Sequence, residues 1–319
     1  MRRKRVDQET SPLSHQSVLL EEAVSALVLQ ANGIYVDGTF GRGGHSRAIL
    51  SRLDAAGRLL GLDRDPEAVT AGELLAASDR RFTIRQGSFA ELNRLLDQSG
   101  LTGPVHGLLL DLGVSSPQLD QPERGFSFMT DGPLDMRMDP HQDESAADWL
   151  ARATQDEIVQ VLRNFGEERF AGRIARAIVT ARARESLRTT RQLADLVART
   201  VPTREPGKHP ATRTFQALRI QVNRELDALS RCLDQIVERL AVGGRLVVIS
   251  FHSLEDRLVK HFIRREAQGP RLPKWAAVQG PMVGGRLRPV GKAVRPSVQE
   301  VTGNPRARSA IMRVAERLP

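Results

Sequence analysis

Two short stretches carry residue types that could hold a nucleotide. Gly41, Gly43 and Gly44 closely follow Asp37, and glycine lets the backbone approach a ligand more closely than other residues do. Asp63 stands 20 residues after Gly43, where an acidic side chain can accept both hydroxyls of a ribose. A glycine-rich loop alone is weak evidence, but the loop and the carboxylate together predict a cofactor that contains a ribonucleoside.

The spacing separates two kinds of cofactor. A dinucleotide site places a third glycine three residues after the second, and this sequence has Ser46 there. Asp37, Gly41 and Gly43 instead resemble the first motif of class I methyltransferases, although Thr39 replaces one usual glycine. By the same resemblance, residues 63–66 look like the ribose-binding segment and residues 86–89 like the segment beside the adenine. S-adenosylmethionine is therefore the better candidate.

Two further segments could orient the group that accepts the methyl. Residues 111–118 begin with Asp111 and contain hydroxyl and amide groups that can hold an exocyclic amine, although Gly, Ser and Pro also favour an ordinary turn. In residues 250–257, Ser253 and Asp256 predict a capping box at the start of a helix. His252 would then face the site, either as a hydrogen-bonded structural residue or as an acid or base.

The elements that must position these residues alternate between short β-rich runs and amphipathic helices. Strands are predicted at 34–40, 58–63, 82–86 and 105–111, with helices at 44–53, 66–77 and 89–98. This alternation indicates an α/β fold with a parallel, doubly wound, Rossmann-like sheet. Ligands of such sheets bind beyond the carboxyl ends of the strands, where the glycine loop, Asp63 and Asp111 stand.

The alternation stops after Asp111. The next strand is predicted only at 245–251, and a gap of more than 130 residues is too long for one crossover. Because most of the gap has helical periodicity, we predict an inserted all-helical substrate-recognition domain. The predicted division is 12–117 for the first part of the methyltransferase domain, 118–212 for the insert and 213–319 for the second part. One helix over 211–241 would return the chain to the sheet, 267–305 would be a long basic loop, and 309–317 a final edge strand.

Composition and length narrow the class of protein. The 319 residues are 40% hydrophobic, enough for a normal core and for about two domains. No apolar run approaches the roughly 18 residues that span a bilayer, and no secretory signal is recognised. The single cysteine, Cys232, cannot form an intramolecular disulfide. We therefore expect a cytoplasmic protein without a membrane span.

The positive charge is unevenly spread. The net charge is +9, but residues 151–219 and 257–319 together carry +18 while the remainder carries −9. A nucleic-acid partner would explain this separation. The alternative is arginine-rich coding bias, since 42 of the 47 basic residues are arginine.

Several blocks, in order along the chain, resemble one family. They are residues 40–46 (FGRGGHS), 111–118 (DLGVSSPQ), 125–128 (GFSF), 135–139 (DMRMD), 147–150 (ADWL), 166–169 (GEER), 213–219 (RTFQALR) and 251–256 (FHSLED). The chain resembles the RsmH (MraW) family of 16S ribosomal RNA cytosine-N4 methyltransferases. The likeness runs from about residue 15 to residue 317.

The resemblance implies S-adenosylmethionine-dependent methylation of the N4 amine of one cytidine, position 1402 in the usual 16S numbering, in the small ribosomal subunit. The residues that it implies as cofactor contacts are Gly43, Gly44, His45, Asp63, Phe89, Asp111 and Gln118. Those that it implies beside the cytidine, together with Asp111, are Trp149, Asn223 and Ser253. Trp149 could instead belong to the core of the insert.

Two other function classes stay open at this point. A nicotinamide-dependent oxidoreductase is disfavoured by Ser46, and a basic RNA-binding protein with a degenerate cofactor site is disfavoured by the intact loop and carboxylates. No cluster of Cys or His predicts a metal, and Asp131, Asp135 and Asp139 are more typical of a solvated loop. The oligomeric state, a homodimer included, is not decided by the sequence.

Overall fold

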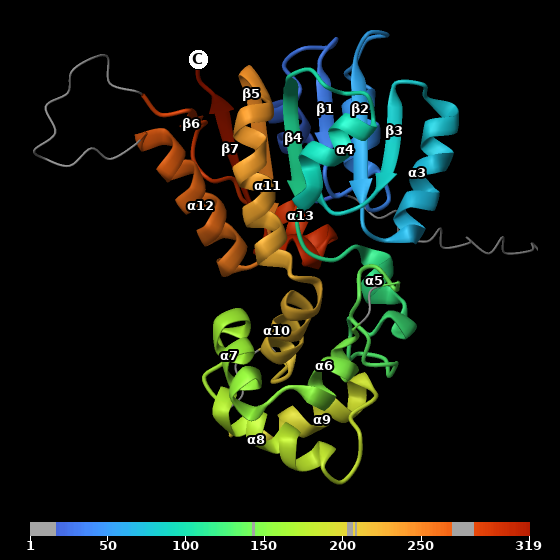
Figure 1. The fold of residues 1–319 in the computed structure, drawn as a ribbon, viewed down its shortest axis with the longest axis vertical. Coiled ribbons are helices and arrows are strands. Elements are labelled where there is room, and N and C mark those ends of the chain that lie inside the picture. The colour runs from blue at the N-terminus through green and yellow to red at the C-terminus, as the bar shows by residue number, and fades with distance from the viewer. Residues whose placement is uncertain (1–16, 142–143, 203–206, 208, 270–283) are drawn as a thin grey trace, which may run out of the picture.

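The fold is built on one twisted sheet. The computed structural model describes residues 17–141, 144–202, 207, 209–269 and 284–319. Its sheet has seven strands in the order β3-β2-β1-β4-β5-β7-β6, and it forms one end of the molecule (Figure 1). The strands are β1 (Ile34–Asp37), β2 (Arg58–Asp63), β3 (Phe82–Gln86), β4 (Val105–Asp111), β5 (Leu240–Ser250), β6 (Leu287–Pro289) and β7 (Ile311–Arg317).

Strands β1 to β5 are parallel, as the sequence predicts, and β7 is antiparallel to both of its neighbours. The predicted parallel, doubly wound, Rossmann-like sheet is therefore confirmed. Its central strands are almost continuously apolar because helices cover both faces of the sheet. The strand predicted at 309–317 is present, but β6 pairs with its outer side, so β6 and not β7 is the edge.

Two hydrophobic cores lie on the two faces of the sheet. One packs α4 (Leu92–Gln98), α11 (Glu225–Arg239) and α12 (Ser253–Gln268) against the strands. The other packs α1 (Leu20–Leu27), α2 (Gly44–Leu50) and α3 (Pro66–Ser78). The helix predicted at 89–98 begins with a 3-10 turn, η1 (Phe89–Glu91). None of the described helices is both long enough and apolar enough to cross a membrane.

A separate helical unit lies beyond the carboxyl ends of the parallel strands (Figure 1). It has a third hydrophobic core, which extends from Phe126 to Leu218. Three of its helices begin with reciprocal capping boxes, at Ser145, Thr154 and Thr189. Its helices are α6 (Ala146–Arg152), α7 (Gln155–Gly166), α8 (Ala171–Arg182), α9 (Thr190–Thr200) and α10 (Thr212–Asn223). Before them come α5 (Ser116–Asp120) and a 3-10 turn, η2 (Pro122–Arg124).

The helical unit was predicted over 118–212, and we propose a later end for it. Helix α10 contributes Phe215, Ala217 and Leu218 to the third core, so it packs with the unit and not with the sheet. The single helix predicted over 211–241 is wrong, because Arg224 has a φ of 49° and separates α10 from α11. We propose that the unit ends at this break.

The C-terminal region contains more regular structure than the predicted loop at 267–305. Residues 270–283 of that prediction lie outside the described residues. Beyond them come β6, then α13 (Val298–Gly303) and a 3-10 turn, η3 (Pro305–Ser309). The Glu300 carboxylate on α13 accepts the backbone N–H of Leu19 (2.7 Å), so this segment is fastened to the start of the described chain.

Candidate active site

A cavity of about 240 Å³ opens at the carboxyl ends of β1, β2 and β4. The glycine loop, the end of β2 and the segment after β4 line it, which is the convergence that the sequence predicts. Six of the seven predicted cofactor residues are in its wall: Gly44, His45, Asp63, Phe89, Asp111 and Gln118. The seventh, Gly43, precedes α2 with a φ of 75°, a conformation that favours glycine.

The glycine loop is held by two carboxylates. Asp63 accepts the backbone N–H of Gly41 (2.8 Å), and Asp37 accepts the hydroxyl of Ser46 (2.7 Å). Ser46 is the residue that departs from the dinucleotide pattern, and its hydroxyl anchors α2 to the end of β1. A Cβ on Gly44 would lie 2.0 Å from the Ser17 hydroxyl, so a larger residue here would require the Ser17 side chain to move.

Asp63 can still receive ligand hydroxyls. Its Oδ1 accepts the backbone N–H of Asp65 (2.9 Å) and its Oδ2 that of Gly41, which leaves each oxygen further acceptor capacity. Burial raises the pKa of Asp63 to about 6, against the opposing effect of these two backbone hydrogen bonds. At pH 7 the group is therefore mostly ionised, as a ribose-binding carboxylate should be.

Asp111 is the least satisfied polar group of the pocket. Its Oδ1 is buried without a hydrogen-bond partner, and its Oδ2 lies 3.6 Å from Nδ1 of His45. Burial, with smaller contributions from Asp37 and Glu255, raises the pKa of Asp111 well above 3.8. A buried acceptor without a donor is costly, so this carboxylate is suited to a ligand that brings a cation or an amine.

Gln118 and Phe89 complete the predicted wall. The Gln118 amide donates to Oδ2 of Asp65 (2.8 Å) and accepts the backbone N–H of Ser115 (3.0 Å), so its orientation is fixed. Arg124 also donates to Oδ2 of Asp65 (2.8 Å). Phe89 reaches the pocket from the 3-10 turn after β3. The wall therefore combines fixed polar groups with one aromatic ring.

Comparison with known proteins assigns the chain. The family model described as the MraW methylase family matches residues 12–318. The chain belongs to the MraW methylase family.

Two curated relatives of this MraW methylase carry the name ribosomal RNA small subunit methyltransferase H. The protein from Thioalkalivibrio sulfidiphilus is 60% identical over 306 residues, which cover 96% of this chain and 98% of the relative. The protein from Thiobacillus denitrificans is 58% identical over 309 residues, which cover 96% and 97%. Among solved structures, an rRNA methylase from Streptococcus thermophilus aligns over 93% of this chain and 92% of its own, with 11% identity and a TM-score of 0.40. That structural match carries no part of the assignment.

The cofactor of the MraW methylase is S-adenosylmethionine, and the residues of the pocket fit it. The ionised carboxylate of Asp63 suits ribose hydroxyls, and the orphan oxygen of Asp111 suits a positively charged or amine-bearing ligand. Gly41 and Gly43, in the loop beside these carboxylates, have positive φ, a conformation that favours glycine. When bound, the cofactor supplies an electrophilic methyl group.

Two of the predicted cytidine residues lie away from the pocket of the MraW methylase. Trp149 is 4% exposed and belongs to the core of the helical unit, the alternative that the sequence left open. Asn223 is fully buried, donates to the carbonyls of Met136 (2.7 Å) and Arg219 (2.9 Å), and accepts the N–H of Met138 (2.8 Å). Asn223 thus ties the end of α10 to the loop before α6, and neither residue lines the cavity.

Ser253, the third predicted cytidine residue, lies at the contact between the helical unit and α12. Its side chain is exposed, and its hydroxyl donates to the Glu167 carboxylate (2.7 Å), which also accepts from Arg257 (3.0 Å). The capping box predicted for Ser253 and Asp256 is wrong. His252 is the N-cap and Glu255 its partner, because β5 ends at Ser250 and α12 begins at Ser253.

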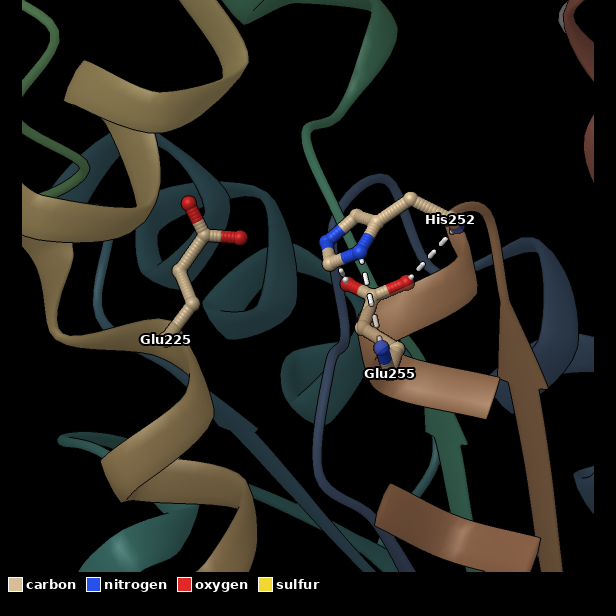
Figure 2. Close-up of side chains that lie close together, drawn as sticks. All are labelled: Glu225, His252 and Glu255. Atoms are coloured by element: carbon tan, nitrogen blue, oxygen red, sulfur yellow. Dashed lines mark hydrogen bonds and ion pairs between the residues drawn. The ribbon is translucent and has the colours of Figure 1, made fainter. Parts of the chain in front are cut away.

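Glu225, His252 and Glu255 meet where α11 and α12 begin (Figure 2). Glu255 accepts the backbone N–H of Phe251 (2.8 Å), and His252 Nε2 lies 3.1 Å from Oε1 of Glu255. Burial would raise the pKa of Glu255, but His252 and Arg219 hold it below its ordinary value. The spacing of the three side chains is compatible with a metal ion. Arg219, however, already donates to both oxygens of Glu225 (2.8 and 2.9 Å), so we interpret the cluster as a charge network that orients the two helices.

Several pocket residues were not found from the sequence. Glu225, Leu229 and Glu255 come from the starts of α11 and α12, and Asn304 and Arg306 come from the segment around η3. The Arg306 guanidinium donates to the Ser116 hydroxyl and to Asp120, and so connects this segment to α5. Because residues 267–305 were interpreted as a loop, nothing in the sequence pattern indicated this wall.

Arg306→Ala should lower the rate of methyl transfer about tenfold. A lost hydrogen bond to a charged group costs roughly 1.5–3 kcal/mol, and water that bonds to the freed groups recovers part of this energy. The substitution frees Ser116 and Asp120 directly after the Asp111 segment, so kcat should fall more than the affinity for S-adenosylmethionine. Steady-state kinetics and calorimetry measure the two effects. Arg308→Ala is the matched control, because Arg308 is exposed and no contact of its side chain is found among the described residues. Equal kinetics for both variants would contradict a positioning role, and Arg306→Lys should restore part of the rate.

Proposed function

We propose that the protein transfers the methyl group of S-adenosylmethionine to the N4 amine of cytidine 1402 in the 16S rRNA of the small ribosomal subunit. The names of the relatives support the subunit and the type of RNA. The observation that best supports an amine as the methyl acceptor is Asp111 at the end of β4. This residue lines the pocket, and its Oδ1 is buried without a hydrogen-bond partner. The proposed cofactor contacts are Gly43, Gly44, His45, Asp63, Phe89, Asp111 and Gln118.

The chemistry required of the site is mainly positioning. The N4 amine of cytosine donates its lone pair to the ring and is a poor nucleophile, so it must be held in line with the bond that breaks. A carboxylate that accepts one N–H of the amine keeps the lone pair directed at the methyl group. Asp111 is placed for this, because it lines the pocket from the end of β4. The surplus proton of the methylated amine is acidic enough to leave to water.

Of the two alternatives that the sequence left open, the nicotinamide-dependent oxidoreductase is excluded by the methylase family assignment. A basic RNA-binding protein with a degenerate cofactor site is disfavoured by the intact geometry of Asp63 and the glycine loop. The catalytic assay separates this second alternative from the proposal.

The decisive experiment uses small subunits that lack the modification. The protein is incubated with them and with labelled S-adenosylmethionine, and the RNA is then digested and its nucleosides are identified by mass spectrometry. We expect one N4-methylcytidine per subunit, mapped to position 1402. Label on another atom or nucleotide, or no label with intact cofactor binding, would overturn the proposed function.

A cytidine within folded RNA must leave its stack to enter this pocket, so other contacts must compensate. The helical unit offers exposed arginines for these contacts. Arg173 and Arg176 on α8 and Arg184 after it are exposed and have no carboxylate partner among the described residues. The alternative role of these arginines is a solvated helix face paired with Glu167, Glu168 or Asp195. Glu167 instead bonds to Ser253 and Arg257, and no ion pair joins the three arginines to Glu168 or Asp195 among the described residues.

Replacing Arg173, Arg176 and Arg184 with Gln should flatten the dependence of small-subunit binding on salt. Each phosphate contact on single-stranded RNA contributes about −0.7 to the log-log slope, so three contacts amount to about two units. Affinity for S-adenosylmethionine should not change. The matched control triple is Arg80, Arg85 and Arg231, also replaced with Gln, since these exposed side chains likewise lack a carboxylate partner among the described residues. A slope that changes equally in both triples would contradict the prediction.

A further inference from the structure

A second groove lies on the flank of the sheet domain, apart from the catalytic pocket. It has a volume of about 270 Å³ and runs between α12 on one side and the β6–β7 region on the other. Its floor is apolar and includes Ile263, Val290 and Val314. No residue is shared between this groove and the catalytic pocket.

Three cationic side chains lie on the rim of this groove, and none of them pairs with a carboxylate of the described residues. Lys260 and Arg264 project from successive turns of α12, and Lys292 faces them from the turn after β6. All three are exposed. None has an ion pair or a side-chain hydrogen bond within the part of the chain that the structure describes, so their charges are available to a ligand.

Unlike the three rim cations, the neighbouring arginines are paired with carboxylates. Arg313 donates to both oxygens of Asp256 (2.7 and 3.0 Å). Arg286 donates to Glu266 and to Glu238, and Arg265 pairs with Asp234. The nearby carboxylates are therefore already used by other arginines. The rim keeps a net positive charge.

We propose that this groove binds a segment of the ribosomal RNA backbone outside the methylation pocket, an inference that rests on the proposed function. The three rim cations would contact phosphates, and the apolar floor would accept the sugars or one unstacked base. The charge distribution supports this occupant, because residues 257–319 carry 14 basic and three acidic side chains. Neutralising phosphates releases counterions, which supplies most of the affinity that such a rim can give.

The groove is connected to the active site through one helix. Helix α12 places Glu255 in its first turn beside the pocket, and between about one and a half and two and a half turns further on it presents Lys260 and Arg264 to the groove. An RNA strand held there would keep a fixed distance from the pocket, since a helix rises about 1.5 Å per residue and bends little. The groove would therefore help to select which cytidine reaches the site, in addition to raising affinity.

The test neutralises the rim in the full-length protein: Lys260→Gln, Arg264→Gln and Lys292→Gln together. Binding to small subunits is measured at several salt concentrations for the parent, this rim triple and the control triple of Arg80, Arg85 and Arg231. We expect the rim triple to flatten the log-log slope by about two units and the control triple to leave it unchanged. S-adenosylmethionine affinity and melting temperature should match the parent, because the three side chains are exposed and remote from the pocket.

The outcomes separate this proposal from the proposed function. If the parent methylates small subunits but the rim triple keeps the parental slope, the groove proposal is overturned and the function stands. If the parent shows the rim-dependent slope but transfers no methyl, the function fails and the groove stands. Binding to poly-glutamate that depends on the rim, with unchanged small-subunit binding, would assign the groove to an acidic protein partner and would also overturn the proposal.

Discussion

Asp111→Asn is expected to remove most methyl transfer while raising the melting temperature of the cofactor-free protein at neutral pH. The amide presents an N–H₂ group where the carboxylate offers acceptors, so the acceptor amine loses its orienting partner. We expect kcat to fall by about 10²–10³-fold, the usual cost of one preorganised polar group in a site. Stability should rise because the parent must bury an acidic group whose Oδ1 has no partner.

The stability gain in Asp111→Asn should depend on pH in a defined direction. Burial raises the folded-state pKa of Asp111 well above 3.8, so the folded protein binds this proton more tightly than the unfolded chain does. Its contribution to stability is complete below pH 3.8 and is lost as the pH rises towards the folded-state pKa. The melting temperatures of parent and variant should therefore coincide near pH 3.5, if both are folded there, and diverge as the pH rises to 7. Near-parental turnover, or a variant that melts lower than the parent at pH 7, would reduce Asp111 to a turn residue.

Asp63→Ala is expected to weaken S-adenosylmethionine binding by one to two orders of magnitude. A charge-assisted hydrogen bond is worth about 1.5–3 kcal/mol, which corresponds to roughly 10- to 150-fold in affinity. The effect should lie towards the upper end, because Asp63 also accepts the backbone N–H groups of Gly41 and Asp65. The substitution therefore loosens the glycine loop as well as removing a ligand contact. Isothermal titration calorimetry measures the change.

The control for Asp63→Ala is Glu73→Ala. Glu73 is an exposed acidic residue on α3, and no contact of its carboxylate is found among the described residues. The Glu73→Ala substitution removes the same charge from the same half of the sheet, so any general electrostatic effect on the cofactor appears in both variants. NAD should not bind the parent protein. Unchanged affinity in Asp63→Ala, or tight binding of NAD, would contradict the assignment of the cofactor site.

The sequence predicts the sheet and one side of the pocket because both depend on local patterns. Short apolar runs determine the parallel strands, and positive-φ glycines beside strand-end carboxylates are recognisable from residue type alone. Asp63 and Asp111 accordingly lie where they were expected. The break at Arg224 was missed because no glycine or proline marks it. Arg224 takes this φ of 49° between Asn223 and Glu225, whose side chains bond to other parts of the chain, and a periodic pattern does not contain those contacts.

The other side of the pocket depends on long-range contacts, and these were not predictable from local pattern. Arg306 reaches Ser116 across 190 residues of chain. The capping partner of His252 was misassigned because Ser253 and Asp256 have the preferred residue types, whereas the end of β5 decides which residue is the cap. Trp149, whose place beside the cytidine stays a prediction, packs into the core of the helical unit, as its alternative interpretation expects.

The pocket wall is drawn from both ends of the described chain, and this affects how the protein acquires function during synthesis. Ser17 and Val18 meet Asn304 and Arg306 in one cavity, and Leu19 is bonded to Glu300, 281 residues away. The strand that follows, β7, pairs with β5. A nascent chain of 299 residues therefore has its glycine loop and Asp111 but neither the far wall nor the strand that supports it. The pocket should therefore be complete only after the segment from α13 to β7 has joined the fold, because this segment supplies the wall opposite the glycine loop and the strand beside β5.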